Sequence, residues 1–184
     1  MNRKRVFMSE YVKHLCFWET EDVCCGEAYQ KFLDFCFENY DYFMLVYVND
    51  MGKGFTAEQK NFLQKLKPFM VKSRSKPTQW PGTICRAKST KFKIVFYKTC
   101  EQAKQILKAF NSISDWLYPD PEDLAFFKGN QCRFYSVTHE IVAGFCYATE
   151  REQSFVETAG IRVYEERYES QITDYEILPE TKDK

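Results

Sequence analysis

Apolar residues recur at intervals of three and four in five segments of the chain, which is the spacing of one face of an α-helix. The predicted helices cover residues 8–15, 27–38, 56–69, 99–110 and 149–159. Three of them begin with the spacing of a capping box, at Thr56 with Gln59, Thr99 with Gln102 and Thr149 with Glu152. Gly160 supplies a C-terminal stop for the last helix.

Other segments have the patterns of β-strands. Residues 42–48 are a continuous apolar run, which predicts a strand covered on both faces near the centre of a sheet. Residues 91–98 alternate lysine with phenylalanine and isoleucine and predict a half-buried strand. Gly129-Asn130 predicts a two-residue hairpin. Further strands are expected at residues 143–148 and 161–168, whereas the basic, turn-rich residues 71–82 are expected to form a loop.

Helices and strands alternate first, and a run of strands follows. This order predicts an α+β fold with a mixed or mostly antiparallel sheet, a β-meander in the C-terminal half and helices packed mainly on one face. We expect a single domain over residues 1–170, followed by an acidic tail at 171–184. Ile172, Tyr175 and Ile177 could add one edge strand from that tail.

Composition and charge narrow the function classes. With 45% apolar residues in 184, the chain can build a substantial core. It carries 26 basic and 26 acidic residues, so no global charge attracts it to nucleic acid or to an anionic membrane. No apolar run reaches the length that spans a bilayer, and the N-terminus lacks a signal-peptide pattern. The eight cysteines are then expected to be reduced thiols in a cytoplasmic protein.

No cofactor or metal site is expected. Cys132, His139 and Cys146 lack the short spacing of zinc ligands, and Cys24-Cys25 are adjacent, which suits neither a zinc site nor a redox motif. Residues 52–54, Gly-Lys-Gly, match no phosphate-binding loop. Buried thiols packed as small apolar groups are the simpler interpretation.

The hairpin region instead offers a candidate interaction surface. Aromatic and arginine side chains anchor many protein interfaces, and here they lie close in sequence to an acidic turn. The candidate residues are Trp116, Tyr118, Asp120, Glu122, Asp123, Arg133, Tyr135, His139 and Glu140. The leading hypothesis is a non-catalytic module that binds another protein, and the chain could also form a homo-oligomer.

Two alternatives remain open. The segment from 71 to 99 contains basic residues interleaved with aromatic ones, which is how a groove for single-stranded nucleic acid is built. Its candidate residues are Lys72, Arg74, Lys76, Trp80, Lys91 and Lys93. The second alternative is a small enzyme centred on His139 and Glu140, with Tyr135 on the same strand face as His139.

Residues 116–147 also carry a resemblance. Pro121-Glu-Asp-Leu124, Phe126-Phe127, Phe134 and Ser136-Val-Thr-His-Glu140 resemble a segment of short, uncharacterised bacterial proteins. That family has a PEDL-type turn, an aromatic strand, a glycine-containing hairpin and an S-[IV]-[ST]-H-E stretch. The resemblance implies a bacterial cytoplasmic protein of the immunity or interaction type, and it assigns no catalytic residue.

Overall fold

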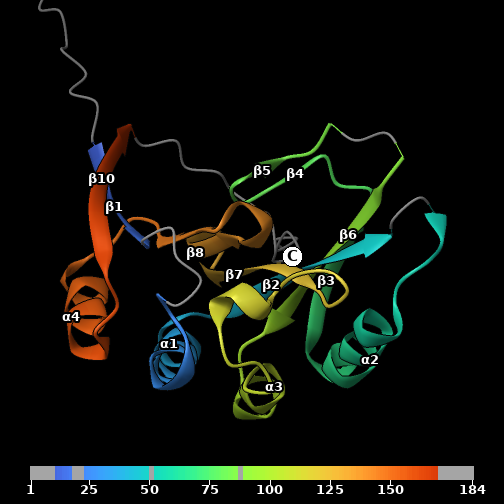
Figure 1. The fold of residues 1–184 in the computed structure, drawn as a ribbon, viewed down its shortest axis with the longest axis horizontal. Helices are drawn as coiled ribbons and strands as arrows, with labels where there is room; N and C mark the ends of the chain where they lie inside the picture. Colours follow the sequence, from blue (N-terminus) through green and yellow to red (C-terminus); the bar gives the residue numbers. More distant parts are fainter. Residues whose placement is uncertain (1–10, 18–22, 50–51, 87–88, 170–184) are drawn as a thin grey trace, which may run out of the picture.

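A single antiparallel sheet organises the molecule (Figure 1). The computed structural model describes residues 11–17, 23–49, 52–86 and 89–169. Within them, the eight strands lie in the order β10-β1-β9-β8-β7-β2-β6-β3, and each neighbouring pair is antiparallel. Their bounds are β1 Tyr11–Phe17, β2 Tyr42–Asn49, β3 Met70–Ser75, β6 Lys91–Lys98, β7 Glu122–Lys128, β8 Gln131–Val137, β9 Val142–Phe145 and β10 Val163–Glu169.

Helices cover one face of this sheet, which is the lower face in Figure 1. Among the described residues they are α1 Gly26–Asn39, α2 Ala57–Leu66, α3 Glu101–Leu107 and α4 Glu150–Ala159. Phe32 of α1 lies at the middle of their core, with its ring centroid 4.6 Å from that of Phe134 on β8. The predicted α+β class, with a mostly antiparallel sheet, a C-terminal meander and helices on one face, is confirmed.

The opposite face of the sheet carries a second apolar cluster. A small hairpin of β4, Gln79–Trp80, and β5, Thr83–Ile84, lies on this side. Trp80 is buried there with Met44, Phe96 and Phe127. Strand β2 is therefore buried on both faces, as its apolar run predicts. The expectation that β6 is half-buried was wrong, because Val95 and Tyr97 on its other face are buried beneath the helices.

Several local signals are confirmed. Thr56 and Thr149 both form complete capping boxes at the starts of α2 and α4. Gly129, with a φ of 56°, opens the two-residue connection between β7 and β8. Gly160 ends α4 in the left-handed region, at a φ of 71°. The proposed edge strand at 172–177 and the tail at 171–184 lie outside the described residues.

Three local predictions were wrong. Residues 11–15, expected to be helical, belong to β1, which is hydrogen-bonded between β10 and β9. Part of the expected loop at 71–82 is the edge strand β3, paired with β6. Thr99 does not cap α3, because its Oγ1 donates to the carbonyl of Tyr40 at 2.7 Å and the helix begins after Cys100.

No disulfide joins any of the eight cysteines, and burial raises the pKa of Cys24 and Cys36, which keeps these thiols protonated. In the part of the chain that the structure describes, no helix is long and apolar enough to cross a membrane.

The contact between β1 and β9 gives a test of the corrected N-terminal strand. A Cβ atom built on Gly144 would lie 2.8 Å from the carbonyl oxygen of Leu15, so the two backbones would have to separate. Gly144→Ala is therefore expected to lower the free energy of unfolding by about 1–3 kcal/mol. Urea denaturation measures this change, and a loss below about 0.5 kcal/mol, the size of an ordinary surface effect, would contradict the pairing of these strands.

Candidate functional site

Trp116 is not part of an exposed surface. Its side chain is fully buried beneath the helices, with its ring centroid 4.5 Å from that of Phe110. The indole Nε1 donates to the hydroxyl of Tyr29 on α1 at 2.9 Å. The prediction that Trp116 is an interface anchor was wrong, because the residue joins the segment before β7 to the helical core.

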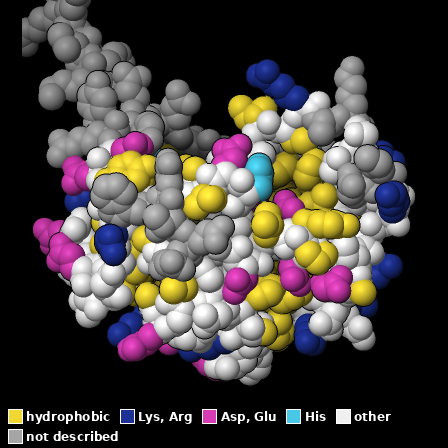
Figure 2. Space-filling model, in the orientation of Figure 1, with side chains coloured by type: hydrophobic (Ala, Val, Ile, Leu, Met, Phe, Trp, Pro, Cys, Tyr) yellow, Lys and Arg dark blue, Asp and Glu magenta, His cyan; other side chains and the backbone are white. Residues whose placement is uncertain are grey.

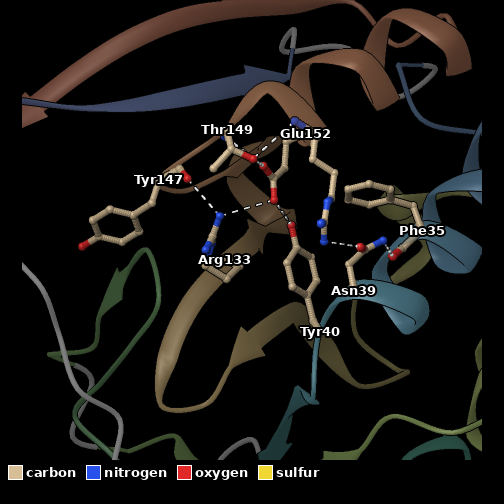
Figure 3. Close-up of polar contacts among 8 residues, drawn as sticks. Phe35, Asn39, Tyr40, Arg133, Tyr147, Thr149 and Glu152 are labelled. Atoms are coloured by element: carbon tan, nitrogen blue, oxygen red, sulfur yellow. Dashed lines mark hydrogen bonds and ion pairs between the residues drawn. The ribbon is translucent and has the colours of Figure 1, made fainter.

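Arg133 is also turned inward, and a β-bulge explains its direction. Phe127 pairs with Cys132 and Phe126 with Phe134, so Arg133 is the extra residue in β8. Its Nη2 donates to the carbonyl of Tyr147 at 2.9 Å and lies 3.3 Å from Oε1 of Glu152 (Figure 3). With only 17% of its side chain exposed, Arg133 is not available as the surface anchor that we expected.

Glu152 is the centre of this buried group, and its contacts are structural. Its Oε1 accepts a hydrogen bond from the hydroxyl of Tyr40 at 2.9 Å, and its Oε2 accepts from the backbone N–H of Thr149 at 2.8 Å and from the Thr149 hydroxyl (Figure 3). Burial opposes ionisation, but the hydrogen bonds from Thr149 and Tyr40 outweigh it and lower the pKa of Glu152. The group thus ties the end of α1 and the bulge of β8 to the start of α4.

Asp123 is the third predicted surface residue that the structure buries. Only 1% of it is exposed. Its Oδ2 accepts from the indole N–H of Trp80 at 2.7 Å, and its Oδ1 accepts from the backbone N–H of Thr138 at 3.1 Å. The carboxylate therefore anchors the β4–β5 hairpin to the sheet. Because Asp123 and Trp80 are buried against each other, neither is exposed to a partner protein or to nucleic acid.

Of the remaining candidates, Tyr135 packs against the second apolar cluster. The other five lie at least partly at the surface, together with apolar neighbours that the sequence pattern did not indicate. We define the acidic–apolar patch as Leu117, Tyr118, Asp120, Glu122, His139, Glu140 and Ile141. The apolar members Leu117, Tyr118 and Ile141 are 39%, 51% and 42% exposed. Figure 2 shows one face of the molecule on which apolar side chains lie beside acidic ones, with a histidine among them.

Short-range contacts hold the patch together. The backbone N–H of Tyr118 donates to Oε1 of Glu122 at 3.2 Å. A carboxylate oxygen of Glu122 and a ring nitrogen of His139 lie within 4.8 Å of one another. Nε2 of His139 lies 3.7 Å from Oε1 of Glu140. Ile141 lines a small cavity with residues of the 3₁₀ turn η3, Ile113–Asp115. Segments before β7 and after β8 therefore meet at one surface.

The patch is electrostatically acidic. Burial and the neighbouring carboxylates of Glu58 and Asp115 raise the pKa of Asp120. Burial and Asp123 likewise raise the pKa of Glu122. Among the described residues, no ion pair joins Asp120 or Glu122 to a lysine or arginine. A positively charged partner would relieve this like-charge repulsion.

The residues of the enzyme alternative do not converge on a pocket. His139 and Glu140 lie in an exposed 3₁₀ turn, η4, at Thr138–Glu140. Tyr135 packs instead against the apolar cluster of the second face, where a Cβ on Gly82 would lie 2.5 Å from its ring. The small cavity beside Ile141 and the two surface hollows beside the start of α4 have none of Tyr135, His139 and Glu140 in their linings. Tyr135 and His139 do not share a strand face as expected, because β8 ends at Val137 and His139 lies in the turn η4.

The basic residues of the nucleic-acid alternative are divided between two faces of the sheet. Lys72 and Arg74 pair with Phe96 and Ile94, so they share the face of the second apolar cluster. Lys91 and Lys93 alternate with those residues and share the helical face with Val95. Lys76 follows β3 with a φ of 56°. Because Trp80 is buried as well, these six residues do not form the expected single groove.

One grouping was missed by the sequence analysis. Glu122 and Asp123 at the start of β7 lie beside His139. Each offers one atom that could bind a metal ion, and the three atoms lie within 4.8 Å of one another. The antiparallel hairpin could have indicated this grouping. Ala125 pairs with Tyr135, so the residues just before Ala125 lie near those that follow Tyr135. As a metal ligand, His139 was considered only with Cys132 and Cys146, so Glu122 and Asp123 were overlooked.

Comparison with other proteins adds no assignment to this geometry. The chain matches no protein-family model, no curated protein and no solved structure.

Proposed function

We propose that the protein is a non-catalytic interaction module that binds a positively charged partner protein through the acidic–apolar patch. The observation that carries the proposal is the gathering of exposed Leu117, Tyr118 and Ile141 among the carboxylates of Asp120, Glu122 and Glu140. Interfaces combine an apolar centre with a polar rim, and an acidic rim selects a basic partner.

The finer parts of the proposal are an immunity-type role and a reducing compartment. The resemblance of residues 116–147 to short bacterial proteins supports neutralisation of a partner toxin as the form of binding. Eight cysteines without a disulfide are compatible with a bacterial cytoplasm. A toxin that acts on nucleic acid would carry the basic surface that the patch requires.

A capture experiment with matched surface variants tests the proposal. Tyr118→Ser combined with Ile141→Ser removes two exposed apolar groups of the patch, while Ile84→Ser removes one that is 74% exposed on β5, outside the patch. We expect the wild type and I84S to capture the same basic protein from the host lysate. The patch variant should bind that protein about tenfold or more weakly, since 1.4 kcal/mol corresponds to a factor of ten.

Two results would count against the proposal. One is equal capture of the partner by the patch variant and I84S, which would place the interface elsewhere. The other is the absence of any specific partner for folded wild-type protein. Binding to the basic partner should also weaken with added salt, because exposed charges are screened over about 10 Å at 0.1 M.

A further inference from the structure

Three metal-ligating side chains come together at the end of the β7–β8 hairpin. Glu122 and Asp123 are the first two residues of β7, and His139 lies in η4, which follows β8. Each offers a ligand atom, and the three atoms lie within 4.8 Å of one another. His139 is half-exposed and Asp123 is buried, so the group extends from the surface inward.

Neighbouring donors hold the two carboxylates in place. The indole N–H of Trp80 and the backbone N–H of Thr138 each occupy one oxygen of Asp123, and the backbone N–H of Tyr118 binds Oε1 of Glu122. Every carboxylate oxygen has more than one lone pair, so these contacts leave acceptor sites free. Outer donors of this kind commonly orient the ligands of metal sites.

The residue before His139 carries an unsatisfied polar group. The hydroxyl oxygen of Thr138 is buried with no hydrogen-bond partner among the described residues, and Thr138 as a whole is only 9% exposed. Thr138 immediately precedes His139, and its own amide binds Asp123. A buried hydroxyl without a partner is costly. Thr138 lines the small cavity beside Ile113 and Ile141, whose lining contains none of the three proposed ligands.

Charge supports the same conclusion. Among the described residues, no ion pair joins Glu122 or Asp123 to a lysine or arginine. A bound divalent ion would supply the missing positive charge.

We propose that Glu122, Asp123 and His139 form a binding site for a divalent transition-metal ion. Two carboxylate oxygens with one imidazole nitrogen suit Mn²⁺ or Zn²⁺, whereas Mg²⁺ prefers oxygen ligands alone. Three protein ligands leave at least one coordination position for water or for a group of another molecule. The site does not depend on the proposed protein partner, although Glu122 and His139 also belong to the acidic–apolar patch.

Titration calorimetry of the full chain with Mn²⁺, after removal of metals by a chelator, tests the site. Mn²⁺ is the first probe because it favours oxygen and nitrogen ligands over the cysteine thiols. We expect one Mn²⁺ ion per chain for the wild type, with affinity reduced at least tenfold in Glu122→Gln and in His139→Gln. Both substitutions preserve side-chain size and lie at positions that are not fully buried.

His14→Gln is the matched control, because it replaces the other histidine of the chain, on β1. It should bind Mn²⁺ like the wild type. A melting temperature that rises with Mn²⁺ in the wild type and in H14Q, but not in H139Q, would support the site through a readout separate from heat. Equal Mn²⁺ affinity in H139Q and the wild type, or no binding to the wild type at millimolar Mn²⁺, would overturn it.

Discussion

Trp116→Ala is expected to lower the free energy of unfolding by about 3–5 kcal/mol, the range for truncating a buried tryptophan. The side chain is fully buried and packs against Phe62 and Phe110, with ring centroids 5.7 and 4.5 Å away. The substitution leaves a cavity between α2 and the end of α3. It also removes the indole donor of Tyr29, whose hydroxyl is buried. Urea denaturation of the two proteins measures the difference.

Two other substitutions separate the causes of that loss. Trp116→Phe keeps much of the apolar volume and loses the indole N–H, so it should cost less than Trp116→Ala. Tyr118→Ala lies two residues away at a side chain that is 51% exposed and should change stability by no more than about 0.5 kcal/mol. A loss of the same size in Y118A and W116A would contradict the division between a buried Trp116 and an exposed Tyr118.

Glu152→Ala is expected to cost about 3–5 kcal/mol, because it leaves Arg133 without its buried counter-charge. It also removes the acceptor of the Tyr40 hydroxyl and one half of the capping box of α4. Glu150→Ala is the matched control, since Glu150 lies on the same turn of α4 and is exposed. We expect E150A to lose less than about 1 kcal/mol, within the usual range for an exposed charge near a helix N-terminus. Similar losses in both variants would contradict the buried ion pair.

The pH dependence of E152A gives a second measure of the same group. Hydrogen bonds from Thr149 and Tyr40 outweigh the effect of burial and hold the pKa of Glu152 below its ordinary value of 4.5. A carboxyl group with a lowered pKa in the folded state stabilises the protein above the unfolded pKa, and this stability is lost as the pH falls through the folded pKa. The difference in unfolding free energy between wild type and E152A should therefore be largest near neutrality and shrink in acid. A difference that grows on acidification would contradict the assignment.

The sequence predicted most of the fold where local pattern and tertiary environment agree. The apolar run of β2, the capping boxes of α2 and α4 and the Gly129-Asn130 hairpin each form as expected. Strand β1 was missed because its partners lie far away in sequence: Leu15 pairs with Glu165 and Phe145. Its residues also fit helical spacing, and no local signal reports pairing across that distance. Edge strand β3 was missed for a related reason, since the strand is defined by its hydrogen-bonded pairing with β6.

The candidate site was predicted in part. Tyr118, Glu122, His139 and Glu140 lie together at the surface, but Trp116 and Asp123 carry polar atoms that found partners inside the molecule. Residue type alone does not tell an exposed side chain from a buried one, because an aromatic or acidic residue near a turn can be in either position. The direction of Arg133 depends on one extra residue in β8, and a bulge of this kind reverses the side-chain alternation on which sequence reasoning relies.

Photo-crosslinking inside expressing cells tests the central claim, that the acidic–apolar patch is where a partner protein binds. A photoreactive amino acid replaces Tyr118 in one protein and Ile84, which is 74% exposed on β5, in another. The proposal predicts that position 118 crosslinks to one protein with a basic surface and that position 84 does not. Crosslinking of that protein from both positions alike, or from position 84 alone, would contradict it.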